Sequence, residues 1–500
     1  SHYIFPEEAK YRNMFLKAKG INYPEEDDFI LDYPDSDTLI KRYKEQGILN
    51  DKQIQEALNN TLIFDKAEKL DINKEIKMPI ISNTPLKELK SILNNAWLEE
   101  RKNIPQSEWK KYLKEIREET KVVEDTNMAE YFLLNYYIIK NSVEKYNGVI
   151  TKTGRGSAPS FYINKLLGFT NIDRISAPIT LFPSRFMSKT RILESHSLPD
   201  IDFNCADTEP FYEASKELLG EDGCWWMLAY KPLQVSSGFR LWCKANDLNI
   251  NDYNAVAMDL AELSKIKKSY TESNYYKDEK WKKLIDDSQH FVGVIESIAQ
   301  HPCSTLLMDK AISREVGLIK AGNIICANIT SYESDNYKFL KNDLLTVSVW
   351  SLINDTCKLA GINTPSIAEL NSKLDEKTWE IYEKGLTCSI NQADSDYATG
   401  LVQTYKPHSV AEMSAFVACI RPGCASLLQD FIHRRPYTTG VEKLDELLID
   451  GAHRMIYQEL IMKYLIWLGV KEDDSYGIIK KIAKKKFKDN ELKELKDKLL

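Results

Sequence analysis

Two aspartates, Asp200 and Asp202, lie two positions apart in the apolar stretch 198–203, Leu-Pro-Asp-Ile-Asp-Phe. On a strand, side chains alternate between the two faces, so both carboxylates would point the same way while Ile201 and Phe203 face the core. Two like charges this close are costly unless cations lie between them, and a pair of Mg²⁺ ions is the usual solution. The commoner alternative, a strand end with two exposed carboxylates, stays open on this stretch alone.

A glycine-containing turn precedes this stretch by about forty residues. A short β-branched run over 149–153 leads into Gly154, Arg155, Gly156 and Ser157, and an apolar helical pattern follows. A turn between a strand and a helix start offers backbone N–H groups to phosphate oxygens. The serine adds a hydroxyl donor and the arginine adds positive charge. Many ordinary strand-to-helix turns also contain Gly-x-Gly, so this motif predicts a phosphate site only together with others.

A third carboxylate, Asp343, lies between apolar residues in the stretch 338–345, with Lys341 two positions before it. If this stretch is a strand, the lysine and the aspartate share one face. A strand carrying this carboxylate beside the Asp200–Asp202 strand would complete a two-metal site.

The composition is that of a globular chain with several domains. Five hundred residues exceed one core, so two to four domains are expected. The net charge of −7 argues against binding nucleic acid through bulk charge and leaves room for a local basic channel. Nine scattered cysteines without C-x-x-C, and seven isolated histidines, indicate neither a zinc ribbon nor a histidine metal site, and fit reduced thiols in a cytoplasm. No apolar run reaches 18 residues, so no membrane partner is expected.

Hydrophobic periodicity divides the chain into helical and strand-rich regions. Apolar stripes at helical spacing predict long scaffold helices over 85–146 and helices again from 346 onward, whereas short apolar runs over 291–345 predict strands. Residues 205–290 look like an inserted helical unit. Its lysine- and aromatic-rich stretch over 265–283 is typical either of a surface that follows a nucleic-acid backbone or of a solvated helical face.

Taken in order, these pieces resemble the catalytic alpha subunit of bacterial replicative DNA polymerase III, the C family of polymerases. The resemblance covers roughly residues 55–500, and seven motifs in one order are far more specific than any single motif. They are residues 129–133, 154–158 with 167–173 downstream, 199–203, 340–345, 421–423, 430–432 and 456–462.

The resemblance implies an α+β fold, in which a polymerase-beta-like nucleotidyltransferase palm carries an inserted helical thumb and mostly helical, incomplete fingers. The expected domains are a remnant or tail of the PHP-domain region with a linker over 1–80, a first palm segment over 81–210, a thumb-like helical insertion over 211–290, a second palm segment over 291–345 and incomplete fingers over 346–500.

The resemblance also implies site residues and an activity. The chain would be a DNA-templated DNA polymerase, a nucleotidyltransferase that joins a dNTP to a primer 3′-hydroxyl by a two-metal mechanism. Two Mg²⁺ ions, for which Mn²⁺ would substitute, would be held by Asp200, Asp202 and Asp343. Triphosphate oxygens would be bound by Gly154, Arg155, Gly156 and Ser157. Lys341 and Arg421 would neutralise charge on the nucleotide.

Several departures from the family pattern indicate a divergent member, and a phage-encoded one is a natural hypothesis. Asn204 replaces a third acid, residues 301–304 read His-Pro-Cys-Ser where the family has His-Ala-Ala-Gly, and residues 391–395 read Asn-Gln-Ala-Asp-Ser where it has Phe-Gln-x-Glu-Ser. The chain is expected to lack the PHP nuclease and the family's C-terminal clamp- and DNA-binding modules.

The expected partners are primer–template DNA and dNTPs, with a sliding clamp, other replisome proteins or a second polymerase polypeptide as further candidates. The expected location is the cytoplasm of a bacterium, or of the host for a phage protein. Two alternatives stay open. One is a template-independent nucleotidyltransferase, and the other is a non-catalytic or split polymerase fragment that binds DNA or the replisome.

Overall fold

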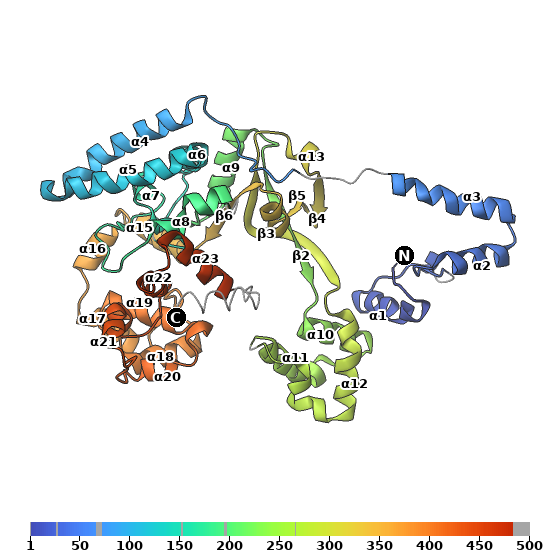
Figure 1. Ribbon diagram of the computed structural model, residues 1–500. Helices are drawn as coiled ribbons and strands as arrows, with labels where there is room; N and C mark the ends of the chain where they lie inside the picture. Colours follow the sequence, from blue (N-terminus) through green and yellow to red (C-terminus); the bar gives the residue numbers. More distant parts are fainter. Residues whose placement is uncertain are drawn as a thin grey trace. The chain divides into compact units, whose positions relative to one another are not determined.

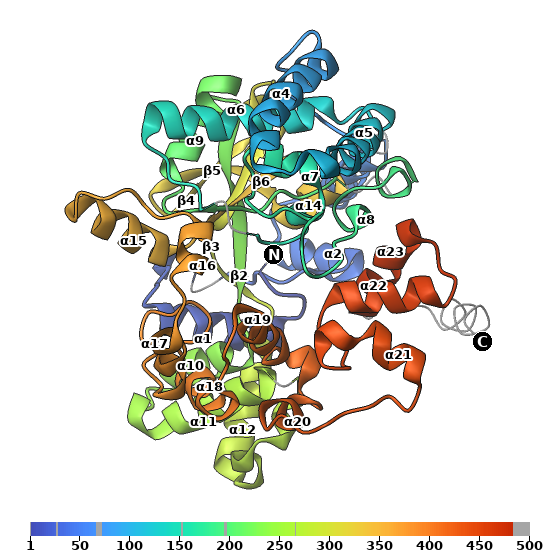
Figure 2. The same ribbon diagram turned by 90° about the vertical axis from the view of Figure 1, so that its left-hand side faces the viewer.

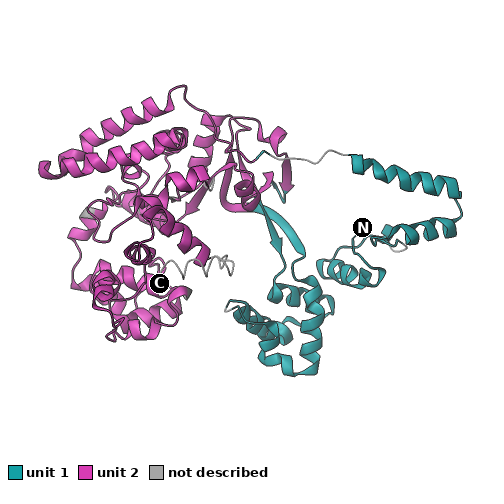
Figure 3. Ribbon diagram, in the orientation of Figure 1, with its two compact units in different colours: residues 1–73, 228–300, 321–324 teal, residues 74–227, 301–320, 325–500 magenta. Residues whose placement is uncertain are grey.

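The computed structural model describes residues 2–26, 29–66, 73–151, 154–194, 198–265 and 267–483. Residues 152–153 of the expected strand before the glycine turn, and 484–500 of the expected fingers, lie outside the described residues. The chain divides into two compact units, coloured separately in Figure 3. Unit 1 comprises residues 1–73, 228–300 and 321–324, and unit 2 comprises residues 74–227, 301–320 and 325–500.

A six-stranded sheet has the strand order β1-β6-β3-β2-β5-β4. Strands β2 to β6 are labelled in Figure 1. β1 runs parallel to β6, whereas β3 runs antiparallel to it. The expectation of strands over 291–345 is confirmed, and the fold is mixed α+β. The strands are β1 (Phe203–Cys205), β2 (Cys224–Pro232), β3 (Ile295–Leu307), β4 (Leu318–Ala321), β5 (Ile324–Thr330) and β6 (Leu340–Thr346).

Three helices of unit 2 confirm the scaffold expected over 85–146. They are α4 (Pro85–Glu100), α5 (Trp109–Asp125) and α6 (Ala129–Tyr146). Trp97 of α4 stacks on Tyr112 of α5 at a centroid distance of 6.0 Å, and both rings are buried. Burial of each large apolar side chain contributes roughly 1.5–3 kcal/mol. The apolar stripes therefore make the helices a rigid support.

α6 is also packed against α9 (Glu209–Leu219), and the two helices lie side by side in Figures 1 and 2. Residues 211–227, which the expected helical insertion includes, belong to the same unit as α6. They contribute most of α9 and the beginning of β2. The compact helical portion of the insertion consists instead of α10 (Val235–Ala245), α11 (Ile250–Lys265) and α12 (Glu279–Ser288).

In unit 1, the N-terminal helix α1 (Ala9–Lys19) packs against the inserted helices. Ala18 joins Trp242 and Phe291 in one buried cluster, and Tyr11 stacks on His290 at 3.7 Å. The N-terminal segment, which continues through α2 (Ser36–Gln46) and α3 (Asp51–Thr61), is therefore anchored to the insertion by α1.

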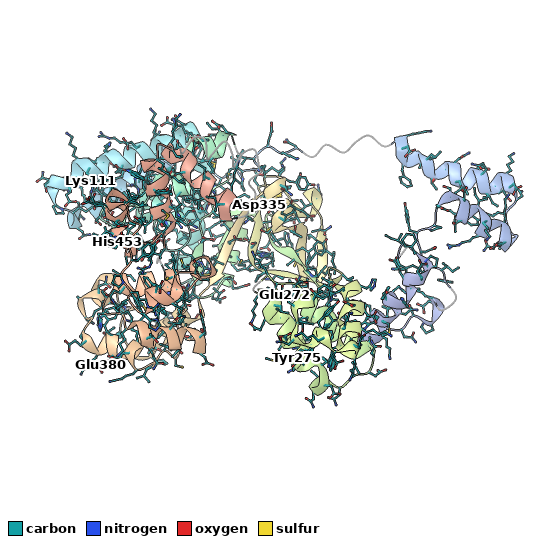
Figure 4. The ribbon with its side chains drawn as sticks, turned by 60° about the horizontal axis from the view of Figure 1, so that its bottom comes forward. Lys111, Glu272, Tyr275, Asp335, Glu380 and His453 are labelled. Carbon is teal, nitrogen blue, oxygen red and sulfur yellow. The ribbon has the colours of Figure 1, made fainter. Side chains whose placement is uncertain are left out.

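The aromatic side chains within 265–283 belong to the core of the insertion. Tyr270, Tyr275, Tyr276 and Trp281 pack against a buried cluster around Phe239 (Tyr275 is labelled in Figure 4). Because these rings are engaged in packing, their spacing is explained by the helical core, and the solvated-face interpretation is favoured for this stretch.

The region of unit 2 after β6 is helical, as expected. A buried cluster that includes Val402, Phe416 and Leu460 forms its core. The helices are α15 (Ser348–Leu359), α16 (Ile367–Ser372), α17 (Glu376–Glu383), α18 (Asp396–Tyr405), α19 (Val410–Cys419), α20 (Leu428–Ile432), α21 (Glu442–Leu447), α22 (Gln458–Trp467) and α23 (Glu472–Ala483). Among the described residues, every helix is too short or too polar to cross a membrane.

Candidate active site

The Asp200–Asp202 segment directly precedes β1, which begins only at Phe203, so the prediction that both aspartates lie on a strand is wrong. Pro199 lacks an N–H and has a fixed φ, which disfavours extension of the ladder toward the N-terminus. The predicted alternation of exposed and buried side chains is present over residues 200–202. Asp200 is exposed, Ile201 is buried and Asp202 is half-buried.

Asp202 and Asp343 are brought together by the parallel pairing of β1 with β6. Phe203 is paired with Leu344, so each aspartate immediately precedes a residue of this pair. Burial raises the pKa of Asp202, and the negative charges of Asp200 and Asp343 raise it further. The three carboxylates therefore form one electrostatically coupled group.

The glycine turn lies directly against Asp202. Gly156 has a φ of +59°, and a Cβ at this position would collide with Oδ2 of Asp202. The approach is set by an antiparallel bridge between Ile150 and Cys205, which is extended by a 2.9 Å hydrogen bond from Thr151 N to the Asn204 carbonyl. The structure thus brings the first two predicted motifs together.

The local structure around this turn differs in some respects from the prediction. Within the described residues, the expected strand before the turn is reduced to the single bridge at Ile150. After the turn, a 3₁₀ segment (Ala158–Ser160) precedes the short helix α7 (Tyr162–Leu166), so α-helix does not follow the glycines immediately. Ser157 is half-buried at the N-cap of this 3₁₀ segment.

Arg155 extends from the turn toward a polar cavity of about 500 Å³ within unit 2. One of its Nη atoms donates to Oδ1 of Asn204 at 3.4 Å, and its positive charge acts to lower the pKa of Asp202. Asn204 thereby accepts a hydrogen bond from a cation. The cavity is lined by Arg155, Thr346, Val347, Val349, Leu352, Ser389, Asn391, Gln392 and Asp394.

Lys341 and Asp343 share one face of β6, as the sequence predicts. Leu340, Asn342 and Leu344 alternate with them and are buried. The Nζ of Lys341 lies 3.6 Å from Oδ2 of Asp343. Burial lowers the pKa of Lys341, but the charges of the surrounding aspartates outweigh this and raise it.

Two polar residues at this site, Asp335 and Ser304, were not predicted as site residues. Asp335, on α14 (Ser331–Asn336), lies with Oδ1 3.7 Å from the Lys341 Nζ (Asp335 is labelled in Figure 4). Ser304 is paired with Asp343 between β3 and β6, and its Oγ donates to the Asp343 carboxylate. His301 Nδ1 in turn accepts a 2.9 Å hydrogen bond from the Ser304 backbone. Ser304 lies in a strand-like run of the sequence, which could have placed it near Asp343. No feature of the sequence pointed to Asp335.

Arg421 is exposed just before the 3₁₀ turn Pro422–Cys424. Among the described residues, no hydrogen bond or ion pair joins its guanidinium to the carboxylate group. Its predicted contact with the nucleotide remains a prediction.

The carboxylate group suits a hard divalent cation by its donor chemistry. Carboxylate oxygens are the ligands that Mg²⁺ prefers, and the mutual repulsion of Asp200, Asp202 and Asp343 is what a cation relieves. In the described regions of the chain, no three His, Cys, Asp or Glu side chains are yet arranged around a common point as metal ligands. The three predicted Mg²⁺ ligands are thus close enough for their charges to interact. Their coordination of a metal ion remains a prediction.

The chain matches the models of two protein families. The family model of the bacterial DNA polymerase III alpha NTPase domain matches residues 87–346, and that of the bacterial DNA polymerase III alpha subunit finger domain matches residues 350–500. The chain therefore belongs to the bacterial DNA polymerase III alpha family.

Two relatives show how much of the family the chain spans. It is 25% identical over 374 residues to DNA polymerase III subunit alpha of Staphylococcus aureus, covering 70% of this chain and 34% of that protein. It is 25% identical over 427 residues to DNA polymerase III subunit alpha of Ureaplasma parvum, covering 82% of this chain and 42% of that protein. The chain thus spans 34% and 42% of the lengths of these two curated relatives.

Proposed function

We propose that this chain carries the nucleotidyl-transfer site of a DNA-templated DNA polymerase, which joins a dNTP to the 3′-hydroxyl of a primer. The observation that carries the proposal is the packing of Gly156 against Asp202 beside Asp343. A phosphate-binding type of turn and a group of coupled carboxylates are the two features that phosphoryl transfer requires in one place. Membership of the polymerase III alpha family supports the same activity.

The carboxylates of Asp200, Asp202 and Asp343 would hold two Mg²⁺ ions, and Mn²⁺ would substitute for them. When bound, these ions would lower the pKa of the primer hydroxyl and stabilise the charge on the transferred phosphoryl group. The role of the chain is to gather these carboxylates. It supplies the compensating charges of Arg155 and Lys341 and holds Asp343 through Ser304.

The glycine turn would bind the triphosphate. The absence of a side chain at Gly156 lets the main chain approach the carboxylates closely, and backbone N–H groups and Ser157 would donate to phosphate oxygens. Lys341 would neutralise charge on the nucleotide, and Arg421 would do so from the fingers segment. The polar cavity beside Arg155 offers room for the rest of the nucleotide.

The fold elements take roles accordingly. The sheet with α4–α9, which include the short helix α8 (Pro183–Phe186), would be the polymerase-beta-like palm, α10–α12 the thumb, and α15–α23 a portion of the fingers. The partners would be primer–template DNA, and a sliding clamp, other replisome proteins or a second polymerase polypeptide would complete the machinery. The protein would act in the cytoplasm of a bacterium or of a phage-infected host.

A test of this function uses a labelled primer on four templates that differ only in the first templating base. With Mg²⁺ and one dNTP at a time, the chain should add only the complementary nucleotide, with or without added replisome proteins. Addition that ignores the template would indicate a template-independent nucleotidyltransferase. Tight binding of primer–template DNA without any addition, under every condition, would indicate a non-catalytic fragment and overturn the proposal.

A further inference from the structure

Two polar side chains, Tyr131 and Asn135, are buried in the middle of the apolar helix α6. Their exposed fractions are 1% and 0%. Residues four apart lie on the same face of a helix, one turn from each other. Burying polar groups among apolar neighbours such as Phe132 and Leu134 is costly unless they are hydrogen-bonded. Tyr131 and Asn135 should therefore each have a hydrogen-bond partner inside the protein.

Each side chain is bonded to a different carboxylate-bearing segment of the candidate site. The backbone N–H of Ile201, between Asp200 and Asp202, donates to Oη of Tyr131 at 3.0 Å. The side-chain amide of Asn342, between Lys341 and Asp343, donates to Oδ1 of Asn135 at 3.0 Å.

The burial of Ile201 and Asn342 places the aspartates on the opposite side from the core. In extended segments neighbouring side chains point to opposite faces, so the side chain of Asn342 meets α6 on the core side, whereas the bond from Ile201 comes from its main chain. The carboxylates of Asp200, Asp202 and Asp343 are thereby left toward the site.

The bonds are fixed by the helix itself. The side-chain amide of Asn135 donates to the main-chain carbonyl of Tyr131 at 2.8 Å, which orients its Oδ1 toward Asn342. Burial raises the pKa of Tyr131, and the negative charge of Asp200 raises it further, so its hydroxyl stays protonated and neutral. One rigid helical turn thus contacts both segments that carry the carboxylates.

We propose that Tyr131 and Asn135 are positioning residues that fix the distance between the Asp200–Asp202 segment and Asp343, and thereby set how tightly the site holds a divalent cation. The inference rests on the proposed function, because it assigns the carboxylates to a metal. Metal ligands need placement within about 0.5 Å, and partners behind the ligands change metal affinity about 10- to 100-fold when removed.

The first test is Tyr131→Phe, which removes one hydroxyl and keeps the ring. The matched control is Tyr162→Phe, because Tyr162 is also fully buried and its hydroxyl has no hydrogen-bond partner among the described residues. Mn²⁺ binding is measured by electron paramagnetic resonance, on the full chain without DNA or nucleotide. We expect Tyr131→Phe to weaken the binding that depends on Asp202 about tenfold, and Tyr162→Phe to stay within about twofold of the wild type.

The second test separates positioning from stability. Asn135→Leu leaves the Asn342 amide without its acceptor and should lower both stability to urea and Mn²⁺ affinity. Adding Asn342→Leu removes the orphaned amide and should restore stability while the affinity for Mn²⁺ stays low. Restoration of both properties would overturn the inference, because the pair would then act only in folding.

Primer extension distinguishes this inference from the function on which it rests. Tyr131→Phe should raise the Mg²⁺ concentration needed for half-maximal extension about tenfold, and excess Mg²⁺ should restore the rate. Wild-type affinity for Mn²⁺ in Tyr131→Phe would overturn the inference alone. Binding of Mn²⁺ that depends on Asp202 and Tyr131, without templated extension by the wild type, would overturn the proposed function alone.

Discussion

The hydroxyl of Ser304 donates a hydrogen bond to the carboxylate of Asp343, directly across the antiparallel pair that β3 and β6 form. The bond fixes one oxygen of Asp343, while Lys341 lies 3.6 Å from the other. The carboxylate is therefore held on both sides by neighbours in the sheet. Ser304 thus contacts the site directly.

Ser304→Ala should slow nucleotide addition. A hydrogen bond to a charged group contributes about 1.5–3 kcal/mol, which corresponds to a roughly ten- to hundredfold loss of rate. The measurement is the single-turnover rate of one nucleotide addition. Ser215→Ala is the matched control, because this buried serine of α9 donates to the Phe211 carbonyl instead. Equal losses in the two variants would contradict a specific role for Ser304.

Gly156→Ala should abolish addition through a collision at Asp202. Gly317 is a suitable comparison, since its φ of +79° is also left-handed but its Cβ would meet nothing within 4 Å. Both substitutions carry the backbone cost of about 1 kcal/mol, but only the one at Gly156 displaces the carboxylate. We expect a loss of at least about a hundredfold for Gly156→Ala and near wild-type rates for Gly317→Ala. Similar rates of nucleotide addition by the two variants would show that the close approach of the glycine turn to Asp202 is unimportant.

Glu119 supports the segment that follows the glycine turn. Its buried carboxylate accepts hydrogen bonds from the backbone N–H groups of Tyr162 and Ile163, both at 2.9 Å, and pairs with Arg174. Glu119→Ala removes one of the two carboxylates that pair with Arg174, which keeps Glu115, and leaves two buried backbone N–H groups without their acceptor. Each lost acceptor costs about 1–3 kcal/mol, so the free energy of unfolding should fall by about 2–5 kcal/mol. The exposed neighbour Glu118 should tolerate alanine within about 0.5 kcal/mol. Urea unfolding followed by tryptophan fluorescence measures both, and equal midpoints would contradict the assignment.

The Glu412–Arg434 pair should make stability depend on pH. Glu412 accepts two guanidinium hydrogen bonds, at 3.0 and 2.8 Å, and these bonds are the main cause that lowers its pKa. A carboxylate with a lowered pKa in the folded state stabilises above its unfolded pKa, and the contribution is lost as the pH falls through the folded value. The difference in unfolding free energy between wild type and Glu412→Gln should therefore be constant near neutral pH and shrink below about pH 4.

Arg434→Gln should show the same pH dependence, because it removes the same pair. The comparison needs urea unfolding at several pH values between about 3 and 7. A difference between wild type and Glu412→Gln that is the same at both ends of this range would be inconsistent with the pair.

The features of the fold that follow from local periodicity could be predicted from the sequence. The shared face of Lys341 and Asp343 follows from the period of a strand, and the burial of Leu89, Leu93 and Trp97 follows from the period of a helix. These patterns depend on neighbours within a few residues, so a single sequence is enough to predict which side chains share a face.

Contacts between distant segments could not be predicted in this way. Asp335 reaches Lys341 only because α14 lies beside β6, and Tyr131 accepts its hydrogen bond from Ile201, 70 positions further along the chain. The close contact between Gly156 and Asp202 depends on a bridge between Ile150 and Cys205. Residues 211–227, at the start of the predicted insertion, form most of α9 and the beginning of β2, which local periodicity did not indicate.

The proposed catalytic role of the carboxylates is tested by single-turnover nucleotide addition by Asp202→Asn and Asp343→Asn. Asp252→Asn, in the exposed first turn of α11, is the control. Both site variants remove one carboxylate charge and nearly conserve shape. We predict that both bind primer–template DNA and melt like the wild type but add nucleotides at least about a thousandfold more slowly, while the control is unaffected. Addition at the wild-type rate by either site variant would contradict the proposed catalytic role of these carboxylates.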